Sequence, residues 1–375
     1  MQLTNYKYVD SDQAHQSGWK YESVSLEKVN LLVGDTASGK SKFLNTIFNL
    51  ARLVARGEFY AGKWKLSFNH AGSNYTYALT SRTESGIARI ISEKLTLHGE
   101  ENDTVIIARM NDECEYNGAP MPKLEKDKSL ITILKENDDV AQIYSAFTLV
   151  MKRNFDGDIL HISRQHHAID GDIDQTFKGD DGLEQLFLMS PPINVKMFLL
   201  DKYFPDIFTE VKELFKECFS FVQDIQITDL RDTGRLVTTS ANVPVFLIKE
   251  KGLPNGILYS NISSGMLKVL ILITDMLTLP EGASYLIDEY ENSLGMSAIN
   301  FFPTLLEEAS DDQQFIITSH HPYIINRMPV SNWIVFKRSG SDVQSMCGNH
   351  LVEYLGKSKQ QAFVKLVNSP FYSGD

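Results

Sequence analysis

The sequence predicts an α/β fold: a mixed sheet with a core around a glycine-containing loop, an antiparallel β region and a helical insertion lobe. Three observations predict it. Residues 29–33 form a short apolar strand that runs into the loop 34–41, and residues 42–56 follow as an amphipathic helix. Residues 64–110 hold short strand-like runs separated by turns. From 263 to about 336, apolar strands alternate with helical segments, as they do in a parallel sheet.

Composition limits the classes of protein to consider. The chain has 375 residues, of which 43% are hydrophobic, so it can bury a sizeable core in two or three domains. Its net charge of −12 disfavours strong non-specific binding to nucleic acid. A local basic patch stays open, although solvated surface charge is the more frequent explanation for each member of the set Arg52, Arg56, Lys63, Lys65, Arg82 and Arg89.

Cysteine usage and the lack of targeting signals indicate a cytoplasmic protein. Cys114, Cys218 and Cys347 stand far apart and form no C-x-x-C pair, so we expect neither a disulfide framework nor a zinc site. The first residues lack a basic start followed by an apolar run. The most apolar stretch, 269–279, is shorter than the roughly 20 residues of a membrane helix, so we expect no membrane partner.

The rest of the chain is predicted to form further short elements. Helical patterns cover 129–153 and 194–222, the second divided at Pro205. The polar stretch 111–128, which holds Asn117-Gly118 and two prolines, is predicted to be an exposed loop or hairpin. Strand-like runs lie at 158–163, 224–229, 235–239 and 245–250. The predicted organisation has three segments: 1–125 with the glycine loop and antiparallel strands, 126–222 as a mainly helical insertion lobe, and 223–375 with the remaining motifs.

The loop 34–41 fits the phosphate-binding pattern G-x-x-x-x-G-K-[ST] in the strand–loop–helix context that the pattern requires. Glycines let backbone N–H groups point at phosphate oxygens. Lys40 would place a cation on the β- and γ-phosphates, and the Ser41 hydroxyl would bind Mg²⁺. The residues expected around the phosphates of ATP are Gly34, Asp35, Thr36, Ala37, Ser38, Gly39, Lys40, Ser41 and Lys42.

Two carboxylates follow the apolar strand 284–287. Asp288 is expected to hold Mg²⁺ through water, and Glu289 to polarise the attacking water as a general base. Paired acids can be plain solvated surface, but a buried strand placed directly before them favours a site. Glu291 is a third acid nearby with a less defined role.

Two further motifs admit structural explanations as well. His320 ends the strand 315–319 and suits a sensor of the γ-phosphate, although a lone histidine is more often structural and His321 follows it. Ser263-Ser264-Gly265 opens an apolar helix, where small residues often serve only as a cap. They also make an anion site, and a second subunit docked head to tail could apply it to the same γ-phosphate.

With these motifs in this order, the chain resembles a soluble ABC-type ATPase, similar to the SMC, RecF and OLD families, over 24–56 and 258–336. The loop matches Walker A, Ser263-Ser264-Gly265-Met266 the signature, 285–289 Walker B, 291–294 the D-loop and 317–322 the switch-histidine region. Asp35-Thr36-Ala37 replaces the more usual Asn-Gly. The resemblance implies ATP-driven dimerisation around two ATPs, and Gln165, which follows a predicted strand, could occupy the glutamine-loop position.

The resemblance most suggests an antiphage-defence ATPase of the Septu or retron-associated type, which regulates a separately encoded effector nuclease. The residues after 336 are too few for a nuclease domain of the OLD kind, and no long coiled coil is apparent. One alternative is a RecF-like repair or recombination ATPase that clamps duplex DNA. Another is a non-hydrolysing, nucleotide-gated scaffold. DNA or RNA stays open as a partner, as does an oligomer larger than a dimer.

Overall fold

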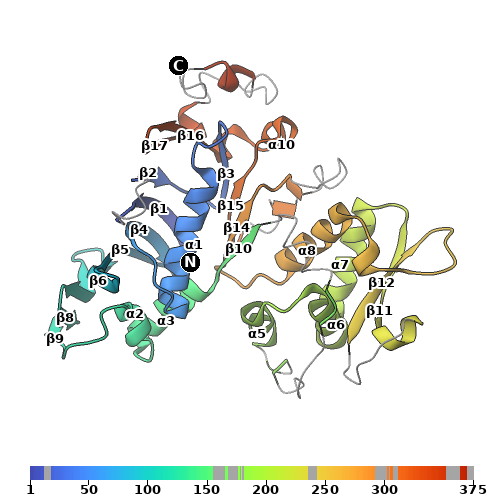
Figure 1. Ribbon diagram of the computed structural model, residues 1–375, viewed down its shortest axis with the longest axis horizontal. Helices are drawn as coiled ribbons and strands as arrows, with labels where there is room; N and C mark the ends of the chain where they lie inside the picture. The colour runs from blue at the N-terminus through green and yellow to red at the C-terminus, as the bar shows by residue number, and fades with distance from the viewer. Residues whose placement is uncertain are drawn as a thin grey trace. The chain divides into compact units, whose positions relative to one another are not determined.

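Contacts divide the chain into two compact units, which are described separately (Figure 1). The computed structural model describes residues 1–11, 18–154, 165–167, 176–177, 179, 181–234, 243–291, 302–303, 305–306, 311–351 and 364–369. Unit 1 comprises Met1–Arg153, Glu281–Glu289 and Leu306–Asp375, and unit 2 comprises Asn154–Pro280 and Tyr290–Leu305. Unit 1 thus gathers the beginning of the chain, the segment around Asp288 and the end of the chain.

Unit 1 is built on one mixed sheet of 14 strands. Their order is β10-β14-β15-β3-β16-β17-β2-β1-β4-β5-β6-β7-β8-β9. The strands are β1 (Gln2–Val9), β2 (Lys20–Ser25), β3 (Val29–Gly34), β4 (Gly62–His70), β5 (Ser73–Glu84), β6 (Ile87–His98), β7 (Thr104–Met110), β8 (Glu113–Tyr116), β9 (Ala119–Pro120), β10 (Val150–Asn154), β14 (Ser284–Asp288), β15 (Gln314–Thr318), β16 (Trp333–Ser339) and β17 (Asp342–Cys347).

The parallel part of this sheet holds the strands that carry the predicted motifs. β14, β15, β3 and β16 run parallel, with Leu286 opposite Ile316 and Ile317 opposite Leu31. Every residue of β3, β14 and β15 is buried, as expected for strands covered on both faces. Because parallel strands end at one edge of the sheet, this arrangement brings the predicted glycine loop and the ends of β14 and β15 to the same edge.

The antiparallel region predicted for 64–110 is confirmed, with one strand more than expected. β4, β5 and β7 coincide with the predicted runs, whereas β6 was not anticipated. Of the two alternatives for 111–128, loop or hairpin, the structure has a hairpin of β8 and β9, and its turn residues Asn117 and Gly118 have positive φ, 49° and 75°. The buried side chains of β4 and β5 include Trp64, Phe68, Tyr75 and Tyr77.

Helices α1 (Lys40–Arg56), α2 (Leu130–Ile133), α3 (Asp138–Thr148) and α10 (Pro322–Arg327) belong to unit 1, with the short turns η3 (Val330–Asn332) and η4 (Gly348–His350). α2 and α3 pack against α1 (Figure 1). This packing places 126–153 with the glycine loop, so the units do not divide at 126 and 223. The helix expected for 129–153 was wrong at its end, because residues 150–154 form β10 beside β14.

Unit 2 combines four helices with a three-stranded antiparallel sheet among its described residues. The helices are α5 (Gly182–Met189), α6 (Ile193–Tyr203), α7 (Pro205–Cys218) and α8 (Ser264–Leu277), the strands are β11 (Val222–Asp229), β12 (Pro244–Glu250) and β13 (Ile257–Leu258), and the turns are η1 (Leu230–Thr233) and η2 (Tyr259–Asn261). The helix boundary predicted at Pro205 is confirmed. The strands expected at 158–163 and 235–239 lie outside the described residues.

α7 packs against both α6 and α8 (Figure 1). Lys196 of α6 and Asp275 of α8 form a buried ion pair of 2.9 Å. No helix in the described part of the chain is both long enough and apolar enough to cross a bilayer.

Candidate functional site

The loop between β3 and α1 depends on its two glycines. Gly34 has φ 156°, and a Cβ there would lie 2.5 Å from the Phe336 carbonyl oxygen. Gly39 has φ 100°, and a Cβ there would lie 2.7 Å from Trp19 Cζ3. Between them Ala37 adopts φ 61°, a left-handed conformation that glycine takes more easily. The loop therefore keeps its tight path although it has fewer glycines than usual.

Lys40 lies inside this loop and is only 3% exposed. Its ammonium donates to the carbonyl oxygens of Gly34 at 2.8 Å and Asp35 at 2.9 Å, and to Ser38 Oγ at 3.2 Å. The first residue of α1 thus brings a positive charge to the centre of the loop, beside the positive end of the helix. Both features favour an anion at this position.

Ser41 and Asp288, both predicted magnesium ligands, meet in the structure. Ser41 Oγ donates to Asp288 Oδ1 at 2.9 Å, across 247 residues of sequence. The hydroxyl of Thr318, at the end of β15, donates to the same oxygen at 2.8 Å. A carboxylate and a hydroxyl are hard oxygen donors that fit Mg²⁺, which takes few protein ligands and keeps several waters. Among the described residues, no three histidines, cysteines or acids cluster as a denser metal site would require.

Glu289, the predicted general base, follows Asp288 at the point where β14 ends. Its backbone has φ 48°, unusual for a residue with a side chain, and its N–H donates to Thr318 Oγ1 at 2.8 Å. Thr318 therefore connects the Asp288 carboxylate with the Glu289 backbone. The Glu289 side chain is exposed. A strained backbone next to a buried carboxylate is typical of functional sites.

The two histidines after β15 have different environments. His321 caps α10, because its Nδ1 accepts a hydrogen bond of 3.2 Å from the backbone N–H of Tyr323. His320 is exposed at the end of β15. The ring of His321 thus has a structural role, and the role of His320 as a sensor of the γ-phosphate stays a prediction.

An aromatic and cationic cluster beside the loop was missed by the sequence analysis. The guanidinium of Arg338 lies 4.2 Å from the Trp19 ring centre and donates to the Ala37 carbonyl oxygen at 3.2 Å. Burial raises the pKa of Tyr21 well above its usual range, so its hydroxyl stays protonated and donates to the Gly39 carbonyl oxygen at 2.8 Å. Lys42, a predicted nucleotide contact, lies 5.6 Å from the Trp19 ring centre.

Lys42 also forms an ion pair of 3.2 Å with Asp10, and the same carboxylate accepts from the Trp19 backbone N–H at 3.1 Å. No local pattern in the sequence links Asp10 or Trp19 with the loop. Trp19 lies beside Asp10 because β1 and β2 pair, with Val9 opposite Lys20, and the pairing of β2 with β17 joins these two strands to the parallel part of the sheet.

The remaining predicted site residues belong to unit 2. Ser263 is the N-cap of α8, and its Oγ accepts from the Met266 N–H at 3.2 Å, so the capping explanation holds for this side chain. Ser264 and Gly265 form the first turn of that helix. Gln165 is exposed, and its carbonyl oxygen accepts from the Tyr259 hydroxyl at 2.7 Å. The D-loop positions 292–294 lie outside the described residues.

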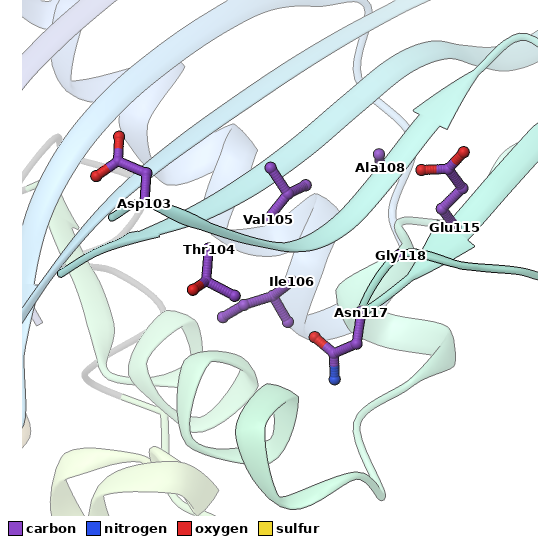
Figure 2. Close-up of a pocket in the computed structure, with 8 residues that line it drawn as sticks. All are labelled: Asp103, Thr104, Val105, Ile106, Ala108, Glu115, Asn117 and Gly118. Atoms are coloured by element: carbon purple, nitrogen blue, oxygen red, sulfur yellow. The ribbon is translucent and has the colours of Figure 1, made fainter. Parts of the chain in front are cut away.

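A separate hollow of about 460 Å³ lies on β7 and β8, and it contains none of the predicted site residues (Figure 2). Its lining mixes two carboxylates with apolar and small residues: Asp103, Thr104, Val105, Ile106, Ala108, Glu115, Asn117 and Gly118. The hollow marks an acidic end of the antiparallel region.

Residues 152–326, a little under half of the chain, match the family described as "AAA domain, putative AbiEii toxin, Type IV TA system". The matched range contains α8, β14 and β15, and it does not include the glycine loop. No curated protein matches the sequence.

Solved SMC heads resemble the chain in structure. The crystal structure of an SMC head bound to the C-terminal winged-helix domain of ScpA has a TM-score of 0.50 at 12% identity, over 92% of this chain and 98% of that one. The SMC head of Thermotoga maritima has a TM-score of 0.40 at 14% identity, over 92% and 99%. The Pyrococcus furiosus SMC head bound to the C-terminal domain of ScpA has a TM-score of 0.47 at 12% identity, over 94% and 98%.

Of these three likenesses, only the first is strong enough to indicate a shared fold, and at 12% identity it says nothing more. The predicted α/β fold with a large mixed sheet is therefore confirmed as similar to an SMC head. The family match and this fold together support a P-loop ATPase of the AAA/SMC-like class.

Proposed function

We propose that the chain binds and hydrolyses ATP at the glycine loop and the adjacent ends of β14 and β15. The observation that carries this proposal is the hydrogen bond of 2.9 Å between Ser41 and Asp288. It joins the residue after the loop lysine to the only buried carboxylate that ends a described strand of the parallel core. Ser41 would hold Mg²⁺ directly and Asp288 through water, and a bound Mg²⁺ would neutralise charge on the phosphate oxygens.

The other residues of the loop take roles that follow from their positions. Lys40 exchanges the carbonyl oxygens of Gly34 and Asp35 for oxygens of the β- and γ-phosphates, while the N–H groups of the loop and Lys42 contact the same phosphates. Trp19 offers a flat surface next to Gly39, and we expect the base of the nucleotide on that side.

Hydrolysis needs a base for water and a donor to the γ-phosphate. Glu289 accepts a proton as the water oxygen bonds to the γ-phosphorus and the bond to the ADP oxygen breaks. His320 donates a hydrogen bond to the γ-phosphate, and the cation of Lys40 stabilises the charge that develops there. The first turn of α8 from a second copy, at Ser263-Ser264-Gly265, would bind the same phosphate, which makes the active form a dimer.

The test is nucleotide binding and phosphate release by the purified chain. Micromolar binding of a fluorescent ATP analogue with steady phosphate release supports the proposal. Binding without phosphate release favours the non-hydrolysing scaffold instead. If neither ATP nor ADP binds, in the presence or absence of Mg²⁺, the proposed site is wrong.

We further propose that the ATPase regulates a separately encoded effector, a nuclease, in antiphage defence. Two observations support this. The matching family is described with a toxin and a type IV TA system, and the similar SMC head is bound to a domain of a separate protein. Co-purification with the product of a neighbouring gene, followed by nuclease assays with and without ATP, tests it. If the nuclease activity of the effector is the same with and without ATP, the ATPase does not regulate it and this proposal is wrong.

A second function, clamping of duplex DNA, is favoured by one surface of the antiparallel region. One row of directly paired residues crosses the six strands β1, β4, β5, β6, β7 and β8. In that order its members are Lys7, Lys65, Ala78, Lys94, Ala108 and Glu115. The neighbouring row contains Lys63, which lies between Val9 of β1 and Thr80 of β5. We call Lys7, Lys63, Lys65 and Lys94 the lysine face.

The lysine face is exposed, and within the described part of the chain none of its four lysines has an ion-pair partner. Lys7 lies directly opposite Lys65, a like-charge pair that weakens a sheet. Such a surface in a chain of net charge −12 fits an anionic partner. The buried aromatic side chains Trp64, Tyr75 and Tyr77 point to the other face, so stacking with single-stranded bases is not offered.

Duplex binding through four lysines would fall with salt, with a slope of log K against log[salt] of about −3 to −4. Lys65→Glu should weaken binding and flatten this slope, whereas Lys28→Glu, at an exposed position before β3, serves as the control. Equal binding by wild type and Lys65→Glu would remove the support for this second function.

A further inference from the structure

A lysine outside the glycine loop, Lys152, lies beside the predicted magnesium ligand Asp288. Lys152 sits on β10, the strand at one edge of the 14-stranded sheet, next to β14. Its ammonium nitrogen lies 4.0 Å from Asp288 Oδ2. The Lys152 side chain is 12% exposed and that of Asp288 is 8% exposed, so the pair is largely shielded from water. A shielded ion pair interacts more strongly than one at the surface.

The two oxygens of Asp288 have different partners. Oδ1 accepts from the hydroxyls of Ser41 and Thr318, on the side of the glycine loop. Oδ2 faces Lys152. The carboxylate is therefore held between two neutral donors and one cation, and a divalent ion that approaches it meets a positive charge that is already in place.

We propose that Lys152 is a built-in counter-ion of Asp288 that competes with Mg²⁺ and thereby sets the Mg²⁺ concentration at which the site binds nucleotide together with the ion. The inference rests on the proposed function, because it concerns the same site. Lys152 neutralises Asp288 when no divalent ion is bound, which lets the nucleotide enter without repulsion from this carboxylate. When Mg²⁺ binds near Asp288, the ammonium and the ion repel each other, and this repulsion lowers the affinity for Mg²⁺.

The experiment is a titration of free Mg²⁺ at fixed fluorescent ATP analogue, with bound nucleotide as the readout, on the full chain. Lys152→Met removes the charge and keeps most of the side-chain volume. We expect the Mg²⁺ midpoint to fall roughly tenfold and the Mg²⁺-free affinity for ATP to fall as well, since Asp288 then repels the phosphates. Lys152→Arg, which keeps the charge, should retain a midpoint close to that of the wild type.

Lys28→Met is the matched control, because Lys28 is exposed and donates to the Asp311 carbonyl oxygen away from Asp288. If circular dichroism shows that Lys152→Met does not fold, Lys152→Gln takes its place in the same titration. An unchanged or higher Mg²⁺ midpoint in the neutral variant overturns the proposal. A loss of ATP affinity that is equal at all Mg²⁺ concentrations also overturns it, because Lys152 would then bind phosphate directly.

The two proposals fail in different ways. If the wild type binds no nucleotide, the proposed function is wrong, and so is the proposed competition of Lys152 with Mg²⁺. If the wild type binds nucleotide in a Mg²⁺-dependent way and the midpoint does not move in the neutral variant, only the role of Lys152 is refuted.

Discussion

Thr318 offers a sharp test of how the site is held together. Its side chain is 1% exposed, and its hydroxyl both donates to Asp288 Oδ1 and accepts from the Glu289 N–H, each at 2.8 Å. Thr318→Val keeps the shape and removes both hydrogen bonds. A hydrogen bond to a charged group contributes about 1.5–3 kcal/mol and one between neutral groups about 0.5–1.5 kcal/mol. We therefore expect the variant to lose about 2–4.5 kcal/mol of unfolding free energy.

The same change should also slow the proposed hydrolysis. Without the Thr318 hydroxyl, the left-handed backbone of Glu289 loses an anchor, so the base is less well positioned. We expect kcat to fall roughly tenfold or more while the affinity for ATP changes little. The hydrogen bonds of the Thr318 hydroxyl go to Asp288 and Glu289, and neither of these is predicted to contact the phosphates.

Urea denaturation followed by tryptophan fluorescence measures the first effect, and Trp19, Trp64 and Trp333 all lie in unit 1. Thr318→Ser keeps the hydroxyl and is the control, with a loss of about 1 kcal/mol for the missing methyl group. The reasoning is refuted if Thr318→Val loses no more stability than Thr318→Ser and hydrolyses ATP at the wild-type rate.

Four further substitutions test the remaining assignments. Lys40→Ala should weaken ATP binding roughly 30-fold or more, because a charged contact to phosphate is lost. An unchanged affinity in isothermal titration calorimetry would contradict the loop assignment. Glu289→Gln should bind ATP, release no phosphate and accumulate as a nucleotide-bound dimer in light scattering; normal turnover would exclude it as the base. Ser263→Arg should spare binding of ATP by the monomer and block the dimer, so dimers that persist with ATP would contradict a shared site. Gly39→Ala should lose several kcal/mol of stability or fail to fold, since its Cβ would meet the Trp19 ring at 2.7 Å; a wild-type thermal midpoint would show that the loop relaxes.

Local patterns in the sequence predicted the elements on which the candidate site lies. The glycine loop, the strand before it and the helix after it follow from spacing within a few residues, and the ends of β14 and β15 follow from short apolar runs. β3, β14 and β15 are distant in the sequence, so the meeting of Ser41 with Asp288 was expected from the order of the motifs and from the resemblance that they carry.

Contacts set by the pairing of distant strands could not be predicted in this way. Lys152 reaches Asp288 because residues 150–154 form an edge strand where the pattern indicated the end of a helix. Trp19 reaches the loop through the pairing of β17 with β2. Nothing in the spacing of these residues carries that information, since a single shift in register would send each side chain to the other face of the sheet.

The pairing of β17 with β2 also has a consequence for the motions of unit 1. The parallel strands and the antiparallel strands belong to one sheet, yet they are joined at this point by only two paired positions, Asp342 with Lys20 and Val343 with Tyr21. The ladders on either side have more paired positions, six between β16 and β17 and four between β1 and β2. This junction should therefore open more easily than they do, and its amides should exchange with deuterated water sooner than theirs. Tyr21 lies in this junction and donates a hydrogen bond to the glycine loop. A nucleotide that orders the loop should therefore slow amide exchange at Lys20 and Tyr21, even if β2 itself does not touch the nucleotide.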